Sequence, residues 1–214
     1  MFGNFEQGQS LFANTENITD GDQIGQFSYQ WQRSTDGNNY ENILSANNET
    51  YELTQDDVEK LVRVEVSFTD NFGKREILLS ENTSKIKNIN DNPTGDLFIV
   101  GNLIEDNILS LDVSNIKDPD GLGHFNYSWE SSTDGFSWDL RENSNQDFII
   151  LSDEDVNTFL KASVNYIDDY GNYETVFSDQ TDIISGVNDP LTGNIQIEGF
   201  LSSGQELRIN TSQI

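Results

Sequence analysis

The chain has 214 residues, which is enough for one large domain or two ordinary ones. Its 38 acidic residues outnumber 11 basic ones, and the net charge of -27 argues against nucleic acid and anionic membrane surfaces as partners. The absence of cysteine excludes disulfides and thiolate metal sites, and no stretch approaches the ~20 apolar residues of a membrane span. Three Trp, seven Tyr and thirteen Phe supply the apolar area that disordered chains lack, so we expect a folded protein.

The sequence repeats itself without gaps at the offset that carries Trp31 onto Trp129, which is 98 residues. At this offset the motif Ser-Thr-Asp-Gly at 34–37 recurs at 132–135. The first copy lacks most of its opening strand and the third ends after its second strand, so we expect a fragment of a longer array. The predicted domains are a first repeat at 1–90, a complete repeat at 91–188 and the truncated start of a third at 189–214.

Within the second copy, apolar residues alternate with polar ones over short runs bounded by Gly, Asn and Asp, which is the pattern of half-buried strands. The sequence Asp168-Asp169-Tyr170-Gly171 predicts a hairpin turn between the last two strands. About seven strands in roughly 98 residues is typical of an Ig-type sandwich, so the predicted fold is all-β, with tandem Ig-like or cadherin-like sandwiches placed end to end. In chain order the predicted strands lie at 96–100, 108–113, 125–130, 136–140, 148–151, 160–167 and 173–178.

Aromatic residues recur at equivalent positions of the two copies. Trp31 and Trp129 lie on the third strand of each copy and are expected to pack between the two sheets. Tyr40 and Trp138 lie near a strand end, where they either pack against the domain or form an exposed aromatic contact. The second reading leaves a carbohydrate-binding sandwich of a secreted protein as an alternative function.

Five short motifs rich in Asp, Asn, Gly and aromatic residues stand out in the two copies. They are Asn90-Asp91-Asn92-Pro93-Thr94-Gly95, Asp118-Pro119-Asp120-Gly121, Tyr127-Ser128-Trp129, Leu53-Thr54-Gln55-Asp56-Asp57-Val58 and Tyr166-Ile167-Asp168-Asp169-Tyr170-Gly171. These motifs resemble those of the bacterial Ig-like and cadherin-like tandem repeats of large RTX-type surface adhesins. The resemblance covers nearly the whole chain and implies a structural or adhesive, extracellular module of the cell surface. The sequence departs from it at Asn188-Asp189-Pro190-Leu191 and at Asp20-Gly21-Asp22-Gln23.

The resemblance also implies a calcium-binding linker at 88–93. An odd number of strands puts the two termini of a sandwich at opposite ends, so loops of both copies should approach this linker. Oxygen-bearing side chains suit Ca²⁺, which takes about 6 to 8 oxygen ligands, but Asp and Asn also favour turns, and that reading stays open for each residue. The predicted ligands are Glu6, Asp56, Asp57, Asn90, Asp91, Asn92, Asp118, Asp120 and Asp168.

Catalysis is not expected. His124 is the only histidine and its counterpart in the first copy is Gln26, so a repeated histidine site cannot exist. We expect a calcium-rigidified stalk whose partners are the neighbouring repeats and, through a distal domain, a cell-surface or glycan ligand. A repeat protein of a high-salt cytoplasm is a further alternative, and it predicts acids scattered evenly over the chain.

Overall fold

The computed structural model describes the whole chain except residues 142–144, 194, 200–201 and 212–214. The described residues form β-strands and two short 3-10 turns, η1 (Gln55–Asp57) and η2 (Asp153–Asp155). This confirms the predicted all-β fold. None of the described helices has the length and apolar character needed to cross a membrane.

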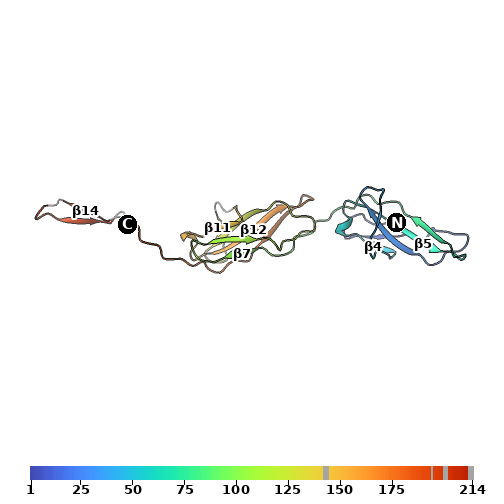
Figure 1. Cartoon of the computed structure of the whole chain (residues 1–214), viewed down its shortest axis with the longest axis horizontal. Coiled ribbons are helices and arrows are strands. Elements are labelled where there is room, and N and C mark those ends of the chain that lie inside the picture. The colour runs from blue at the N-terminus through green and yellow to red at the C-terminus, as the bar shows by residue number, and fades with distance from the viewer. Residues whose placement is uncertain (142–144, 194, 200–201, 212–214) are drawn as a thin grey trace. The chain divides into compact units, whose positions relative to one another are not determined.

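The first copy contains two antiparallel groups of strands. One is a four-stranded sheet in the order β3-β2-β5-β6 and the other is the pair β1-β4, which the bridge between Phe2 and Phe12 extends. The strands are β1 (Ser10–Phe12), β2 (Ser28–Ser34), β3 (Glu41–Asn42), β4 (Thr50–Glu52), β5 (Leu61–Thr69) and β6 (Arg75–Leu79). Figure 1 labels β4 and β5 in this part of the chain.

The core of the first copy lies between these two groups of strands. Alternate residues of β5, Val62 and Val64, are buried and belong to one apolar cluster with Leu11 of β1 and Trp31 of β2. The Trp31 indole donates to the carbonyl of Asn48 at 2.9 Å, so its one polar group is satisfied in the core. The prediction that Trp31 packs between the sheets is therefore confirmed.

The second copy repeats this arrangement at the same offset. Its sheets have the orders β10-β9-β12-β13 and β11-β8-β7. Trp129 of β9 is fully buried and donates to the carbonyl of Gln146 at 3.0 Å, so it repeats Trp31. The seven predicted strands are confirmed as β7 (Phe98–Gly101), β8 (Ile108–Asp112), β9 (Asn126–Ser132), β10 (Asp139–Leu140), β11 (Phe148–Ile150), β12 (Phe159–Ile167) and β13 (Tyr173–Phe177) (Figure 1).

The last segment forms a two-stranded hairpin. Strand β14 (Gln196–Gly199) pairs with β15 (Leu207–Asn210) in the register that β7 and β8 use in the second copy. Its apolar side chains are open to solvent: Leu207 is 49% exposed, whereas its counterpart Leu109 is fully buried. The predicted pair of opening strands is thus present, while the parts of 189–214 at 194, 200–201 and 212–214 lie outside the described residues.

The chain divides into two compact units. The first consists of Met1–Asp96, Ser114–Asn126 and Val164–Val176, and the second of Leu97–Val113, Tyr127–Ser163 and Phe177–Ile214. The first unit therefore includes the linker around Asp91 together with two loops of the second sequence copy. The repeat boundaries 1–90, 91–188 and 189–214 stay a prediction.

Candidate functional site

Asp57, one of the predicted ligands, lies fully buried at the end of η1. Its Oδ2 accepts hydrogen bonds from the Tyr51 hydroxyl at 2.7 Å and from the main-chain N–H of Thr54 at 2.9 Å. Arg33 Nη1 lies 3.4 Å from Asp57 Oδ1 and also 3.4 Å from Oδ2 of the neighbouring Asp56. The Asp57 carboxylate therefore caps its own turn and pairs with an arginine.

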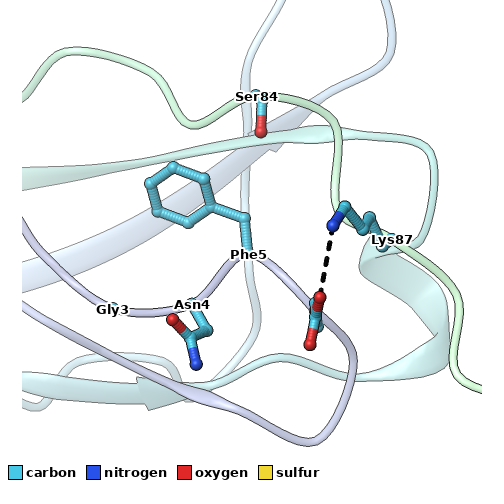
Figure 2. A pocket seen from close by; sticks show the side chains of 6 residues that line it. Gly3, Asn4, Phe5, Ser84 and Lys87 are labelled. Atoms are coloured by element: carbon cyan, nitrogen blue, oxygen red, sulfur yellow. Dashed lines mark hydrogen bonds and ion pairs between the residues drawn. The ribbon is translucent and has the colours of Figure 1, made fainter.

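Glu6, a second predicted ligand, forms an ion pair with Lys87 at 3.3 Å. The pair borders a pocket of about 340 Å³ that Phe5 and Ser84 also line (Figure 2). The next residue, Gln7, is the one that reaches the linker. Its Nε2 donates to Asp91 Oδ2 at 2.6 Å.

The first compact unit brings several predicted ligands of the linker together. The main-chain N–H of Asp91 donates to Asp120 Oδ2 at 2.7 Å, and Gln55 Nε2 donates to Asp120 Oδ1 at 2.9 Å. Asn90 Nδ2 donates to Glu174 Oε1 at 2.8 Å, while Asn92 is exposed. Asp91 and Asp120 are thus neighbours whose oxygens already accept hydrogen bonds from protein donors.

Asp118 and Asp168 also accept hydrogen bonds, Asp118 from strand β12 and Asp168 within its own loop. The Tyr166 hydroxyl donates to Asp118 Oδ2 at 2.6 Å. Asp168 accepts the main-chain N–H groups of Tyr170 and Asn172, both at 2.8 Å, which closes the predicted hairpin turn. Burial alone would raise the pKa of Asp168, but the hydrogen bonds from the side chain and main chain of Asn172 lower it.

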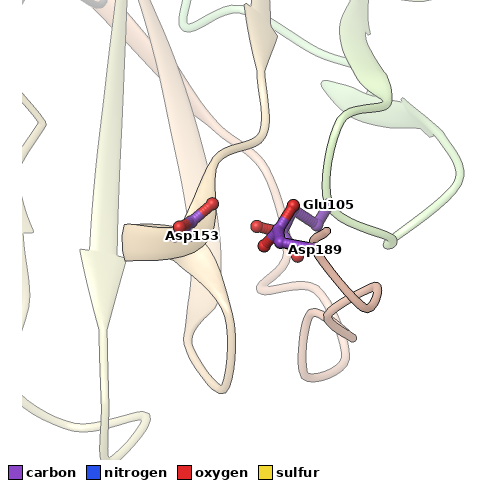
Figure 3. Close-up of side chains that lie close together, drawn as sticks. All are labelled: Glu105, Asp153 and Asp189. Atoms are coloured by element: carbon purple, nitrogen blue, oxygen red, sulfur yellow. The ribbon is translucent and has the colours of Figure 1, made fainter. Parts of the chain in front are cut away.

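A different set of carboxylates forms the candidate metal centre. Ligand oxygens of Glu105, Asp153 and Asp189 lie within 4.8 Å of one another (Figure 3). Among the described residues, this is the one group of three or more such side chains. All three belong to the second compact unit, and none of the nine predicted ligands is part of the cluster.

The local structure positions Glu105 and Asp153. Glu105 follows β7 and is held by a hydrogen bond from its main-chain N–H to the carbonyl of Ser185 at 2.9 Å. Asp153 opens η2, which the buried carboxylate of Asp155 stabilises by accepting the N–H of Ser152 at 2.7 Å. Asp189 lies on the linker that follows the second copy.

The electrostatics of the cluster favour a cation. Glu105 is only 3% exposed, and its Oε2 accepts the main-chain N–H of Val187 at 2.9 Å. The close carboxyl of Asp153 raises the pKa of Glu105, and burial and the charge of Asp189 act in the same direction. An all-oxygen donor set of this charge fits a hard divalent cation such as Ca²⁺, which would relieve the repulsion between the carboxylates.

The positions of the cluster have counterparts in the first copy, and the ligand prediction did not compare them. Moving the cluster back by one repeat carries Glu105 onto Gln7, Asp153 onto Gln55 and Asp189 onto Asp91. The predicted ligand Glu6 lies one residue away from the position that reaches the linker. The repeat thus relates the cluster to the first linker, but the loop arrangement in the structure is needed to show that these three positions lie together.

The aromatic pair predicted at the strand ends is partly covered by basic side chains. The Arg63 guanidinium lies 3.6 Å from the centre of the Tyr40 ring, and Lys161 Nζ lies 4.6 Å from that of Trp138. Both aromatic side chains are half-buried. One face of each ring therefore packs against its own domain, as the first of the two readings predicts.

Comparison with known proteins gives distant likenesses. A family model described as a domain of unknown function, DUF8696, matches residues 3–71. No curated protein matches the sequence. A solved structure described as a "Ca2+-stabilized adhesin" that "helps an Antarctic bacterium reach out and bind ice" has 11% identity and a TM-score of 0.33, and the match covers 86% of this chain and 46% of that one.

A second solved structure, the FN1-FN3 domains of chicken CNTN1, has 10% identity and a TM-score of 0.35, and the match covers 97% of this chain and 73% of that one. The chain spans about half the length of the adhesin structure. Likenesses this distant assign neither a family nor a ligand. The described residues form antiparallel β-sheets in both sequence copies, with an acidic cluster at the end of the second copy.

Proposed function

We propose that the chain is a structural and adhesive module of an extracellular bacterial surface protein, an adhesin stalk that Ca²⁺ stiffens at its acidic linker. The observation that carries this proposal is the cluster of Glu105, Asp153 and Asp189 where the second copy joins the following linker. A cation held by all three would tie the β7–β8 loop, η2 and the linker together. The module then contributes length and stiffness, and no catalysis.

The chemistry of the cluster supports this assignment. Three carboxylates this close repel one another unless a proton or a cation lies among them, although water screens part of the repulsion at Asp153 and Asp189, which are exposed. At neutral pH a divalent cation is the natural occupant, and oxygen ligands select Ca²⁺ or Mg²⁺ over softer metals. The larger Ca²⁺ tolerates irregular coordination better than Mg²⁺, so we assign the site to Ca²⁺.

The partners follow from the same proposal. Neighbouring repeats of the same chain are the immediate partners, and a distal domain would bind a cell-surface or glycan ligand. The nine ligands predicted around the first linker stay a prediction. Because several of their oxygens already accept protein hydrogen bonds, a cation there would have to compete with those donors.

Calcium titration of the chelator-treated chain tests the proposal. Isothermal calorimetry should detect Ca²⁺ binding that is lost in Glu105→Gln and Asp153→Asn, with Mg²⁺ binding more weakly. Glu154→Gln is the matched control, because this acidic neighbour in η2 is not part of the cluster. In small-angle scattering, Ca²⁺ should lengthen the wild-type particle, and no binding in calorimetry would overturn the calcium assignment.

A further inference from the structure

The two linkers of this chain carry different chemistry at equivalent positions. Gln7 and Gln55 stand where Glu105 and Asp153 form the acidic cluster, while Asp91 and Asp189 are the same residue type. The first linker therefore keeps one of the three carboxylates and replaces the other two by neutral amides. Amide nitrogen is a hydrogen-bond donor, which a carboxylate is not.

The backbone around the two positions is the same, so the difference lies in the side chains. The main-chain N–H of Gln7 donates to the Lys87 carbonyl at 3.0 Å, as that of Glu105 donates to the Ser185 carbonyl at 2.9 Å. The N–H of Ile89 donates to Gln7 Oε1 at 3.3 Å, as that of Val187 donates to Glu105 Oε2 at 2.9 Å. One side-chain oxygen thus has the same role in both linkers.

The other terminal atom of each side chain decides how the linker is closed. In the first linker this atom is Gln7 Nε2, which donates to Asp91 Oδ2 at 2.6 Å. In the second linker the ionised carboxylate of Glu105 has no N–H to donate, and one of its oxygens lies within 4.8 Å of oxygens of Asp153 and Asp189, which are also acceptors. The hydrogen bond between Gln7 and Asp91 forms without a bound ion. The carboxylates of Glu105, Asp153 and Asp189 repel one another unless an ion or a proton lies among them.

Gln55 reinforces the first linker in the same way. Its Nε2 donates to Asp120 Oδ1 at 2.9 Å and to the Pro119 carbonyl at 3.2 Å. Asp120 is 1% exposed and also accepts the main-chain N–H of Asp91. A donor from the position equivalent to Asp153 thus reaches the carboxylate that holds the linker backbone.

We propose that the first linker is closed by the amides of Gln7 and Gln55 in place of a divalent cation, so that the calcium response of this chain belongs to the second linker alone. The statement that calcium acts at the second linker rests on the proposed function. The statement that the first linker is ordered without calcium depends only on the hydrogen bonds of Gln7, Gln55 and Asp91. Two buried amide oxygens near the first linker, Gln55 Oε1 and Asn88 Oδ1, accept no hydrogen bond in the structure; on this proposal water satisfies them, and a calcium response at 88–92 would show that a cation does.

Amide hydrogen exchange of the full chain, read by mass spectrometry with Ca²⁺ or with chelator, tests both halves. Residues 88–92 should change by less than about twofold between the two conditions. Residues 186–190 should exchange at least roughly tenfold more slowly with Ca²⁺. A calcium response of similar size at 88–92 would overturn the inference, and no response at 186–190 would instead count against the proposed function.

Reciprocal variants separate the two outcomes further. Exchanging the amides for acids, Gln7→Glu with Gln55→Asp, should make exchange at 88–92 depend on calcium. The opposite exchange, Glu105→Gln with Asp153→Gln, should abolish the calcium dependence at 186–190. Glu6→Gln is the control, because Glu6 pairs with Lys87 and not with the linker. If amide exchange at 88–92 does not depend on calcium in the variant with Gln7→Glu and Gln55→Asp, the two amides do not explain the difference between the linkers.

Discussion

Asp57 and Asp155 are buried carboxylates at equivalent positions, and both stabilise a 3-10 turn. Each accepts the main-chain N–H of the residue three positions earlier. Each also pairs with an arginine: Arg33 of β2 lies 3.4 Å from Asp57, and Arg141, which follows β10, lies 2.8 Å from Asp155. The sequence predicts Asp57 as a metal ligand because its loop should approach the first linker, and this stays a prediction. The hydrogen bonds that Asp57 accepts give it a structural role in its own turn, and that role does not require a metal.

Asp155→Ala should therefore destabilise the chain by about 3 kcal/mol, because it leaves Arg141 without its carboxylate and removes the cap of η2. Urea unfolding followed by tryptophan fluorescence would measure the loss. Asp155→Asn is the matched control and should cost less, because its amide oxygen can still accept the N–H of Ser152. Equal losses in both variants would show that the capping hydrogen bonds contribute little.

Asp134 should make the stability of the folded chain fall at low pH. Hydrogen bonds from the main chain of Ser137 and Phe136 lower the pKa of Asp134 to about 2. The unfolded chain binds this proton more readily, so the stabilisation is present above about pH 4 and is lost as the pH falls through about 2. The variant Asp134→Asn keeps an acceptor at Oδ1, and its unfolding midpoint should fall less than that of the wild type over this range.

Glu105 should affect the pH dependence of stability in the opposite direction to Asp134. Its pKa is raised by the contact with Asp153, so the folded chain holds this proton more readily than the unfolded one. In chelator, stability from this group therefore falls as the pH rises from about 4, the ordinary pKa of glutamate, through the raised value. Glu105→Gln should become the more stable protein in chelator at pH 7 and the less stable one in Ca²⁺, as measured by thermal melting. The same order in both conditions would argue against a cation among these carboxylates.

At the scale of the strands, the sequence was a good guide because burial imposes a period of two. Strand β8 at 108–112 and strand β12 at 159–167 lie within one or two residues of their predicted bounds. The strand predicted at 136–140 is shorter, because Asp134 Oδ1 accepts the N–H groups of Phe136 and Ser137 and holds them in a turn.

The candidate site was harder to predict from the sequence. Asp and Asn have the same signature in turns as in metal sites, so composition could not separate Asp168, which closes its hairpin, from Asp189, which joins the cluster. The contribution of Gln7 was missed because glutamine is not an acidic ligand. Only the arrangement of the loops shows that Gln7, and not Glu6, reaches Asp91.

The hairpin β14-β15 provides a test at this scale. A two-stranded hairpin without a covering sheet is marginally stable, and Ile197 and Ile209 are 68% and 69% exposed. Its amide hydrogens should exchange close to the rate of an unfolded chain. The pair β7-β8 has the same register and a buried face at Leu109, so it is the internal control and should be protected. Comparable protection of both pairs would mean that something covers the hairpin.

For the whole molecule, the acidic surplus and the calcium proposal are linked. A net charge of -27 opposes compaction through self-repulsion, and the repulsion is strongest where carboxylates gather. Bound cations at a linker would remove part of it, whereas amides at the other linker avoid it. An array built from both kinds of linker would respond to calcium only at its acidic linkers, which gives a stalk whose stiffness varies along its length.

Thermal unfolding of the full chain by calorimetry, with Ca²⁺ and with chelator, tests the central claim most directly. At a free Ca²⁺ concentration of roughly 100 times the dissociation constant, binding stabilises the folded state by about 2.7 kcal/mol. The wild type should then melt roughly 10 °C higher in the part that contains the second linker. The double variant with Glu105→Gln and Asp153→Gln should show no rise. A wild-type curve that calcium does not move, or an equal rise in the double variant, would contradict the account.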